Sequence, residues 1–99
     1  MPRVRLVPRA ARQAKSIDVW WRENRLASPD LFAEELASAI DALAAAPEIG
    51  SKYDAMDVSG IRRLLLRTTQ VHVFYDFDGT TARVLAAWSC RRGRSPSLG

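Results

Sequence analysis

The chain has 99 residues, and its 47% apolar content is sufficient for one domain with one modest core. Its formal net charge of +4 permits binding to nucleic acid or to an acidic protein and does not choose between them. No run approaches the roughly 18 apolar residues of a membrane span, and the N-terminus lacks the apolar region of a secretory signal, so we expect a single cytoplasmic domain over residues 1–99, without membrane binding.

The N-terminal quarter of the sequence predicts a strand followed by a helix. Basic and apolar residues alternate over Pro2–Val7, which fits a short strand with Val4 and Leu6 facing inward. From Pro8 to Arg25 the spacing of apolar residues becomes helical. The buried stripe of this helix is expected to contain Ala10, Ala14, Ile17 and Trp21, with Gln13 and Trp20 beside it.

A second helix is predicted after a break at residues 24–29. Ser28 is a favourable N-cap, Pro29 suits the first helical position, and Pro47 ends the helix. Its buried stripe is expected to contain Phe32, Leu36, Ile40 and Leu43. Its polar side is expected to face solvent through Glu34, Glu35, Ser38 and Asp41.

The second half of the chain predicts a loop followed by a sheet. Residues 47–59 are rich in turn-forming residues and are expected to form a long loop. Three apolar runs, at residues 61–67, 71–77 and 83–88, then indicate an antiparallel meander. Asp78-Gly79, between the last two runs, is the strongest local signal for a two-residue hairpin turn.

The predicted architecture is an α+β two-layer fold in the order β-α-α-β-β-β, with a helical hairpin packed on one face of a mainly antiparallel sheet. The opposite face is expected to be open, and residues 94–99 are expected to form a flexible tail. Side chains alternate along a strand, so we place one set in the helix-covered core and the other on the open face. The core set is Val71, Val73, Tyr75 and Trp88, and the open-face set is His72 and Phe74.

Basic residues gather at both ends of the chain. Residues 1–25 hold seven basic and two acidic side chains, residues 26–60 hold one and seven, and residues 61–99 again hold seven and two. The arginines that fringe the sheet could bind the phosphates or carboxylates of a target, or they could simply be solvated. The candidate target-binding residues are Arg62, Arg63, Arg67, Arg91, Arg92 and Arg94.

His72 and Cys90 are the only histidine and the only cysteine. They provide no zinc-site spacing and no internal disulfide, so we expect neither a metal nor a cofactor. Cys90 is expected to be a small buried thiol, and the alternative is a reactive thiol made acidic by Arg91 and Arg92. His72 is expected to be a partly exposed strand residue with a local hydrogen bond, and the alternative is a general acid or base, or an imidazolium that contacts phosphate. If the chain is an enzyme, its chemistry is expected to rest on the cationic side chains and His72, as in metal-independent cleavage of RNA by positioning and charge stabilisation.

Six segments, in this order and at this spacing, carry a resemblance to a known family: Trp20-Trp21 and residues 28–36, 43–50, 60–64, 71–75 and 84–93. Together they resemble the RelE/ParE superfamily of bacterial toxins from type II toxin–antitoxin systems, and more closely its ParE-like members. The likeness covers nearly the whole chain.

The resemblance implies a toxin that a cognate antitoxin neutralises, in a toxin–antitoxin hetero-oligomer. RelE-like members cleave mRNA on the ribosome, and ParE-like members poison DNA gyrase. A RelE-like member would use Arg63, His72 and Arg92 as catalytic residues. However, Leu65, His72 and Leu98 stand where a RelE-like surface has basic residues and a tyrosine. We therefore predict a ParE-like toxin that poisons gyrase, with a RelE-like mRNA endonuclease or an inactive binding member as the alternatives.

Overall fold

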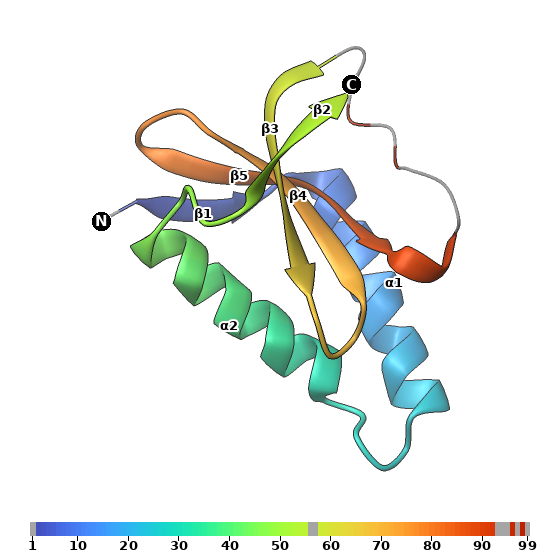
Figure 1. Cartoon of the computed structure of the whole chain (residues 1–99). Helices are drawn as coiled ribbons and strands as arrows, with labels where there is room; N and C mark the ends of the chain where they lie inside the picture. The colour runs from blue at the N-terminus through green and yellow to red at the C-terminus, as the bar shows by residue number, and fades with distance from the viewer. Residues whose placement is uncertain (1, 56–57, 93–95, 97, 99) are drawn as a thin grey trace.

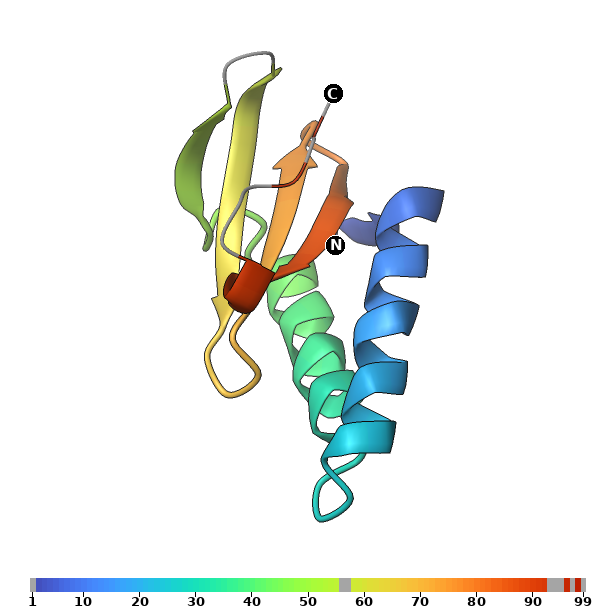
Figure 2. The ribbon, with the colours of Figure 1, turned by 90° about the vertical axis from the view of Figure 1, so that its right-hand side faces the viewer.

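The computed structural model describes residues 2–55, 58–92, 96 and 98 of the chain. Its elements, in chain order, are β1 (Arg3–Leu6), α1 (Pro8–Asn24), α2 (Leu31–Ala45), β2 (Ser51–Ala55), β3 (Val58–Leu66), β4 (Val71–Phe77), β5 (Thr81–Ser89) and the 3-10 turn η1 (Cys90–Arg92). The five strands form one sheet in the order β1-β5-β4-β3-β2, in which only the β1–β5 pair is parallel. Both helices cover one face of this sheet, which confirms the predicted α+β two-layer fold (Figures 1 and 2).

The expected long loop at residues 47–59 contains a strand that the sequence analysis missed. This strand, β2, pairs antiparallel with β3, and β3 itself begins at Val58, three residues before the predicted start. Lys52 and Asp54 are exposed and flank the half-buried Tyr53, and the only other apolar residue of the strand is Ala55 at its end. Such a short polar edge strand gives almost no hydrophobic period, and it is defined by its hydrogen bonds to β3.

The helices bury most of the predicted stripes, whereas Ile17, Leu36 and Ile40 are only half buried. The helix α2 also begins later than predicted. Ser28 is not its N-cap, because the helix starts at Leu31 with Asp30 in the capping position. The Asp30 carboxylate makes no capping hydrogen bond and instead accepts one from Arg22 of α1, at 2.7 Å. An ion pair across the loop therefore joins the end of α1 to the start of α2. The buried helical residues are Ala10, Ala14, Trp21, Phe32, Ala39 and Leu43.

Glu35, which was expected to face solvent, holds the β3–β4 connection onto α2. Its carboxylate accepts hydrogen bonds from the backbone amides of Thr68 (2.8 Å) and Thr69 (3.0 Å) and from the Thr69 hydroxyl (2.6 Å). Partial burial alone would raise the pKa of Glu35, but the hydrogen bonds from Thr69 and Thr68 outweigh it and lower the pKa. The expectation failed because the partners lie more than thirty residues away in sequence.

The β4–β5 hairpin turns at the predicted place, but its connection, Asp78-Gly79-Thr80, is one residue longer than the predicted two-residue turn. Gly79 has a φ of +99°, which favours glycine, and the Asp78 carboxylate accepts hydrogen bonds from the amides of Thr80 and Thr81, each at 2.8 Å. These contacts fix the start of β5 relative to β4.

A β-bulge in β5 reverses the side-chain alternation that the sequence predicted. Phe74 pairs with Ala86 and Tyr75 with Val84, so Leu85 is the additional residue. Leu85 and Ala86 both pack on the face away from the helices. Tyr75 is fully buried in the helix-side core, as predicted, whereas Trp88 packs on the opposite face and not in that core.

The face of the sheet away from the helices, which we call the outer face, is not open as predicted. It carries a second hydrophobic cluster, and its buried members are Ile61, Phe74, Leu85, Ala86 and Leu98. Phe74 is only 2% exposed and Leu98 only 8%, so the end of the chain returns to cover the strands. Within the predicted flexible tail, Pro96 is also buried, and the other residues lie outside those described. This face therefore has an apolar centre.

Candidate functional site: the outer face and the groove beside it

The arginines predicted to bind a target are distributed over different parts of the molecule. Arg63 and Arg67 are exposed on β3 and at its end, and Arg91 and Arg92 are exposed on η1. Arg62 points to the helix side of β3, where it is half buried, and Arg94 lies outside the described residues. The sheet thus brings Arg63 and Arg92 to the outer face, and separates both from Arg62.

Arg62 is held by the turn that precedes β2. Its Nη1 donates hydrogen bonds to the carbonyl oxygens of Gly50 (2.8 Å) and Glu48 (3.2 Å). The Gly50 amide in turn donates to the hydroxyl of the buried Tyr75, at 2.8 Å. These contacts give Arg62 a role in positioning the chain ahead of the edge strand, and its guanidinium is turned away from the outer face.

Two arginines of the outer face lie over aromatic rings. The guanidinium carbon of Arg63 is 5.1 Å from the centre of the Tyr53 ring, and Tyr53 meets Phe74 edge to face with ring centres 4.9 Å apart. The guanidinium carbon of Arg92 is 4.2 Å from the centre of the Trp88 ring. An arginine that stacks on an aromatic ring keeps its charge and donors available while its position is restrained. These two pairs frame the apolar centre of the outer face.

His72 lies between these pairs, and its surroundings oppose its protonated form. In the sheet it is opposite Leu65 on one side and Trp88 on the other. Burial lowers the pKa of His72, and the charge of Arg63 lowers it further. Its Nδ1 lies 3.4 Å from the sulfur of Cys90, which is exposed and not buried as expected. His72 therefore offers a polar contact, and its surroundings disfavour its charged form.

The three residues that a RelE-like enzyme would use share the outer face but surround apolar side chains. Arg63 and Arg92 each stack on a ring, and His72 lies next to the exposed Leu65 and the buried Phe74. This arrangement places hydrogen-bond donors at the edges of a hydrophobic patch. It can bind a surface that combines apolar groups with anions or carbonyl oxygens.

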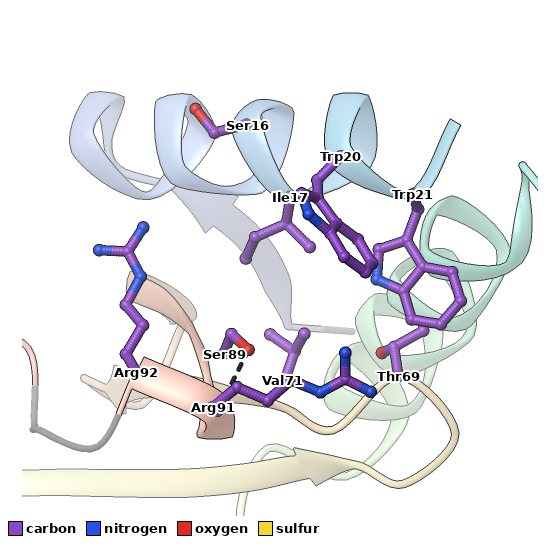
Figure 3. A pocket seen from close by; sticks show the side chains of 9 residues that line it. All are labelled: Ser16, Ile17, Trp20, Trp21, Thr69, Val71, Ser89, Arg91 and Arg92. Carbon is purple, nitrogen blue, oxygen red and sulfur yellow. Dashed lines mark hydrogen bonds between the residues drawn. The ribbon is translucent and has the colours of Figure 1, made fainter. Parts of the chain in front are cut away.

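A groove between α1 and the end of β5 is a second feature, which the sequence analysis did not anticipate. Its volume is about 310 Å³, and Figure 3 shows Ile17, Trp20 and Trp21 projecting from α1 toward Val71 and Arg91. The full lining consists of Ser16, Ile17, Trp20, Trp21, Thr69, Val71, Ser89, Arg91 and Arg92. The tandem Trp20-Trp21 was the available signal, since only one of two successive helical residues can point into the core. We call this feature the α1–β5 groove.

Two further observations concern other kinds of site. Among the described residues, His, Cys, Asp and Glu side chains form no group of three that could hold a metal ion. In the same part of the chain, no helix is long and apolar enough to cross a membrane.

Comparison with known proteins identifies the family. Residues 4–93 match the family model described as ParE toxin of type II toxin-antitoxin system, parDE. The chain belongs to the ParE toxin family. Membership confirms the predicted ParE-like side of the superfamily, in agreement with the departures at Leu65, His72 and Leu98.

A solved structure supports the same fold for this ParE toxin. A chain of the chromosomal ParDE TA system from P. aeruginosa aligns with it at a TM-score of 0.68 and 16% sequence identity, over 90% of this chain and 96% of the other. At this identity the likeness concerns the fold alone. No curated protein sequence matches this chain. The target of this ParE toxin must therefore be argued from its own surface.

Proposed function

We propose that this ParE toxin arrests growth by binding and poisoning DNA gyrase through its outer face, and that a cognate antitoxin neutralises it. The observation that carries the proposal is the pair of arginine–aromatic contacts, Arg63 on Tyr53 and Arg92 on Trp88, on either side of an apolar centre. Arginine and large aromatic residues dominate the energetics of protein–protein interfaces. This combination supports recognition of a protein surface.

The character of His72 supports binding over RNA cleavage. A general acid or base is most effective when its pKa lies near the working pH, and a phosphate-binding imidazolium must be charged. Burial and Arg63 oppose the charged form of His72, and its Nδ1 already contacts Cys90. The alternative is cleavage of RNA by Arg63, His72 and Arg92, and an experiment must distinguish it from poisoning of gyrase.

A gyrase assay tests the target. Purified toxin is added to gyrase and relaxed plasmid, and supercoiling and cleaved DNA are measured. We expect inhibition by the wild type, at least about tenfold weaker inhibition by Arg92→Ala and Arg63→Ala, and no change with Arg12→Ala, an exposed arginine on α1.

Two results would contradict the gyrase proposal. One is unaffected gyrase at toxin concentrations that arrest growth. The other is mRNA cut at fixed codon positions on ribosomes, with the cutting lost in Arg92→Ala, which would establish the RNA-cleaving alternative. Expression without growth arrest would instead indicate an inactive binding member.

Co-expression tests the antitoxin. The reading frame adjacent to the toxin gene is expressed with it, and the complex is isolated through a tag on the toxin. The acid-poor terminal thirds of the chain, with two acidic residues in each, suit an acidic partner. We expect a stable complex and restored growth, and a failure to co-purify would remove this half of the proposal.

A further inference from the structure

Two arginines of the edge strand β1 point to the outer face. Val4 and Leu6 of this strand pack against the helix-side core. Because side chains alternate along a strand, Arg3 and Arg5 point the other way, and both are exposed. The strand pairs with the start of β5, whereas Arg92 follows the end of β5. Arg3 and Arg5 therefore lie at the opposite end of the outer face from Arg92.

A third arginine stands beside these two. In the parallel pairing of β1 with β5, Arg5 is opposite Arg83. Arg83 points to the outer face, because its neighbours Ala82 and Val84 belong to the helix-side core. Neighbouring strands are about 5 Å apart, so like charges at facing positions repel each other and reduce the stability of the sheet. A bound anion would relieve this repulsion. We call Arg3, Arg5 and Arg83 the arginine cluster.

The nearby carboxylates are already engaged by other groups. Asp76 forms an ion pair with Arg83, with 2.8 Å between Oδ2 and Nη2. Asp78 accepts hydrogen bonds at Oδ1 from two backbone amides and one hydroxyl of the β4–β5 connection. Within residues 2–55, 58–92, 96 and 98, neither Arg3 nor Arg5 forms an ion pair. The donors of these two guanidinium groups are therefore available to an external anion.

The arginine cluster lines a broad polar hollow. Its volume is about 860 Å³, against about 310 Å³ for the α1–β5 groove. Ser59 and Thr81 contribute hydroxyl groups to the lining, and Gly60 leaves the backbone accessible. Of the described residues that line the hollow, Phe77 is the only aromatic one, and it is half buried against the helix-side core.

This lining distinguishes between classes of partner. Protein interfaces are centred on large apolar anchors, and sites for single-stranded nucleic acid carry exposed aromatic rings on which the bases stack. The backbone of a duplex is instead bound by cations, hydroxyl groups and backbone amides, which contact its phosphates. The hollow offers this second set of groups, so its chemistry suits a duplex.

We propose that the arginine cluster binds the phosphate backbone of double-stranded DNA. The choice of DNA as the source of the phosphates rests on the proposed function, because gyrase holds duplex DNA when it is poisoned. Arg63 and Arg92 then contact gyrase, and the arginine cluster at the other end of the outer face contacts the DNA. The toxin thereby bridges the enzyme and its substrate, which favours the trapped state over release of the DNA.

Direct DNA binding tests the site without gyrase. Full-length toxin is titrated into a short fluorescein-labelled DNA duplex at several salt concentrations, and anisotropy gives Kd. We expect Kd at low salt to rise at least about fivefold for Arg3→Ala and for Arg5→Ala, and the slope of log Kd against log salt concentration to fall by about 1 in each. Arg5→Lys should retain most of the binding because it keeps the charge. Arg12→Ala, at an exposed arginine of α1 that does not line the hollow, should change Kd by less than about twofold.

Thermal melts distinguish lost binding from lost folding. Arg5→Ala removes one of two facing charges, so we expect its Tm without DNA to be no lower than that of the wild type. Addition of the duplex should raise the Tm of the wild type more than that of Arg5→Ala. Equal Kd values for the wild type, Arg3→Ala and Arg5→Ala at every salt concentration would overturn the assignment. Tighter binding of single-stranded DNA or RNA than of the duplex would also overturn it.

The gyrase assay separates this inference from the proposed function. We expect the double variant Arg3→Ala/Arg5→Ala to bind gyrase in the absence of DNA as the wild type does, and to trap at least about fivefold less cleaved DNA. An unchanged yield of cleaved DNA with this variant would overturn the bridging role and leave gyrase as the target. Wild-type toxin that binds the duplex through the arginine cluster but leaves gyrase unaffected would overturn the proposed target and leave the phosphate site standing.

Discussion

The guanidinium carbon of Arg92 lies 4.2 Å from the centre of the Trp88 ring, on the face of the sheet opposite the helices. This contact depends on the bulge at Leu85, because an unbroken alternation would turn Trp88 toward the helices. The contact of this cation with the half-buried indole is expected to contribute about 0.5–1 kcal/mol. The bulge thus places both the arginine and the ring that restrains it on the surface proposed to bind the target.

A double-mutant cycle should detect the contact between Arg92 and Trp88. The free energy of unfolding in urea is measured for Arg92→Ala, Trp88→Leu and the double variant. We expect a coupling of about 0.5–1 kcal/mol, since the second substitution removes a contact that the first has already abolished. Arg67→Ala combined with Trp88→Leu is the control. Coupling as large in the control as in the Arg92 cycle would contradict the assignment.

Gly50→Ala should destabilise the protein strongly. A Cβ atom at this position would lie 2.6 Å from Oη and 2.7 Å from Cε1 of Tyr75, which is fully buried. We expect a loss of about 2–3 kcal/mol in the free energy of unfolding, measured in urea. Ser51→Ala, at the exposed next residue, should change it by less than about 0.5 kcal/mol. Equal stabilities of the two variants would show that Gly50 is not closely packed.

Glu35→Gln should weaken the protein at neutral pH and reduce its sensitivity to acid. The pKa of Glu35 is lower in the folded state, so its contribution is present above the ordinary carboxyl pKa and is lost as the pH falls through the folded pKa. We expect a loss of about 1 kcal/mol at pH 7, which disappears in acid. Thermal melts between neutral and acidic pH measure this, with the exposed neighbour Glu34→Gln as the control. A loss that persists unchanged in acid would contradict the role of the Glu35 carboxylate.

Leu98→Ala should destabilise the outer-face cluster. Leu98 is 8% exposed and packs in the cluster that contains Phe74 and Ile61. We expect a loss of roughly 2 kcal/mol in the free energy of unfolding, at the low end for truncation of a buried leucine because the residue is near the chain end. Leu26→Ala, at a residue that is 80% exposed, is the control. If both variants unfold at the same urea concentration, the end of the chain does not cover the sheet in solution.

His72 should titrate below the ordinary histidine pKa. Burial is the main cause and Arg63 adds to it, so Arg63→Ala should raise the pKa of His72 without restoring its ordinary value. The chemical shift of the His72 ring proton as a function of pH measures both. Arg12→Ala, at an exposed residue of α1, the helix on the opposite face of the sheet, should leave the titration unchanged. A pKa above the ordinary value would favour a cationic His72 and weaken the argument against RNA cleavage.

The sequence predicted the elements whose signals are local. The apolar stripe of α1 is visible because Ala10, Ala14 and Trp21 repeat with the helical period and make the same side of the helix apolar. The Asp78-Gly79 turn is visible because glycine accepts a positive φ that other residues avoid. The same period placed Trp21 in the buried stripe and Trp20 beside it, and the structure confirms this, with Trp21 8% and Trp20 39% exposed.

The missed features depend on partners that are distant along the chain. Glu35 looks like a solvated helix residue until Thr68 and Thr69 are brought to it by the β3–β4 connection. The edge strand β2 has only two apolar residues, Tyr53 and the terminal Ala55, and it is defined by its pairing with β3. Neither the Glu35 hydrogen bonds nor the β2–β3 pairing produces a periodic pattern of apolar residues in the sequence.

The sequence by itself determined the two-layer fold and, through its motifs, the likeness to ParE-like toxins. It also placed several arginines near the end of the sheet. Only the tertiary structure decided which of those arginines share a surface, because one additional residue at Leu85 moves Trp88 to the outer face and gives Arg92 its ring. Alternation along a strand is a local rule, whereas a bulge arises where hydrogen bonds between two strands slip by one residue. The Arg92–Trp88 contact of the candidate site therefore depends on the bulge at Leu85.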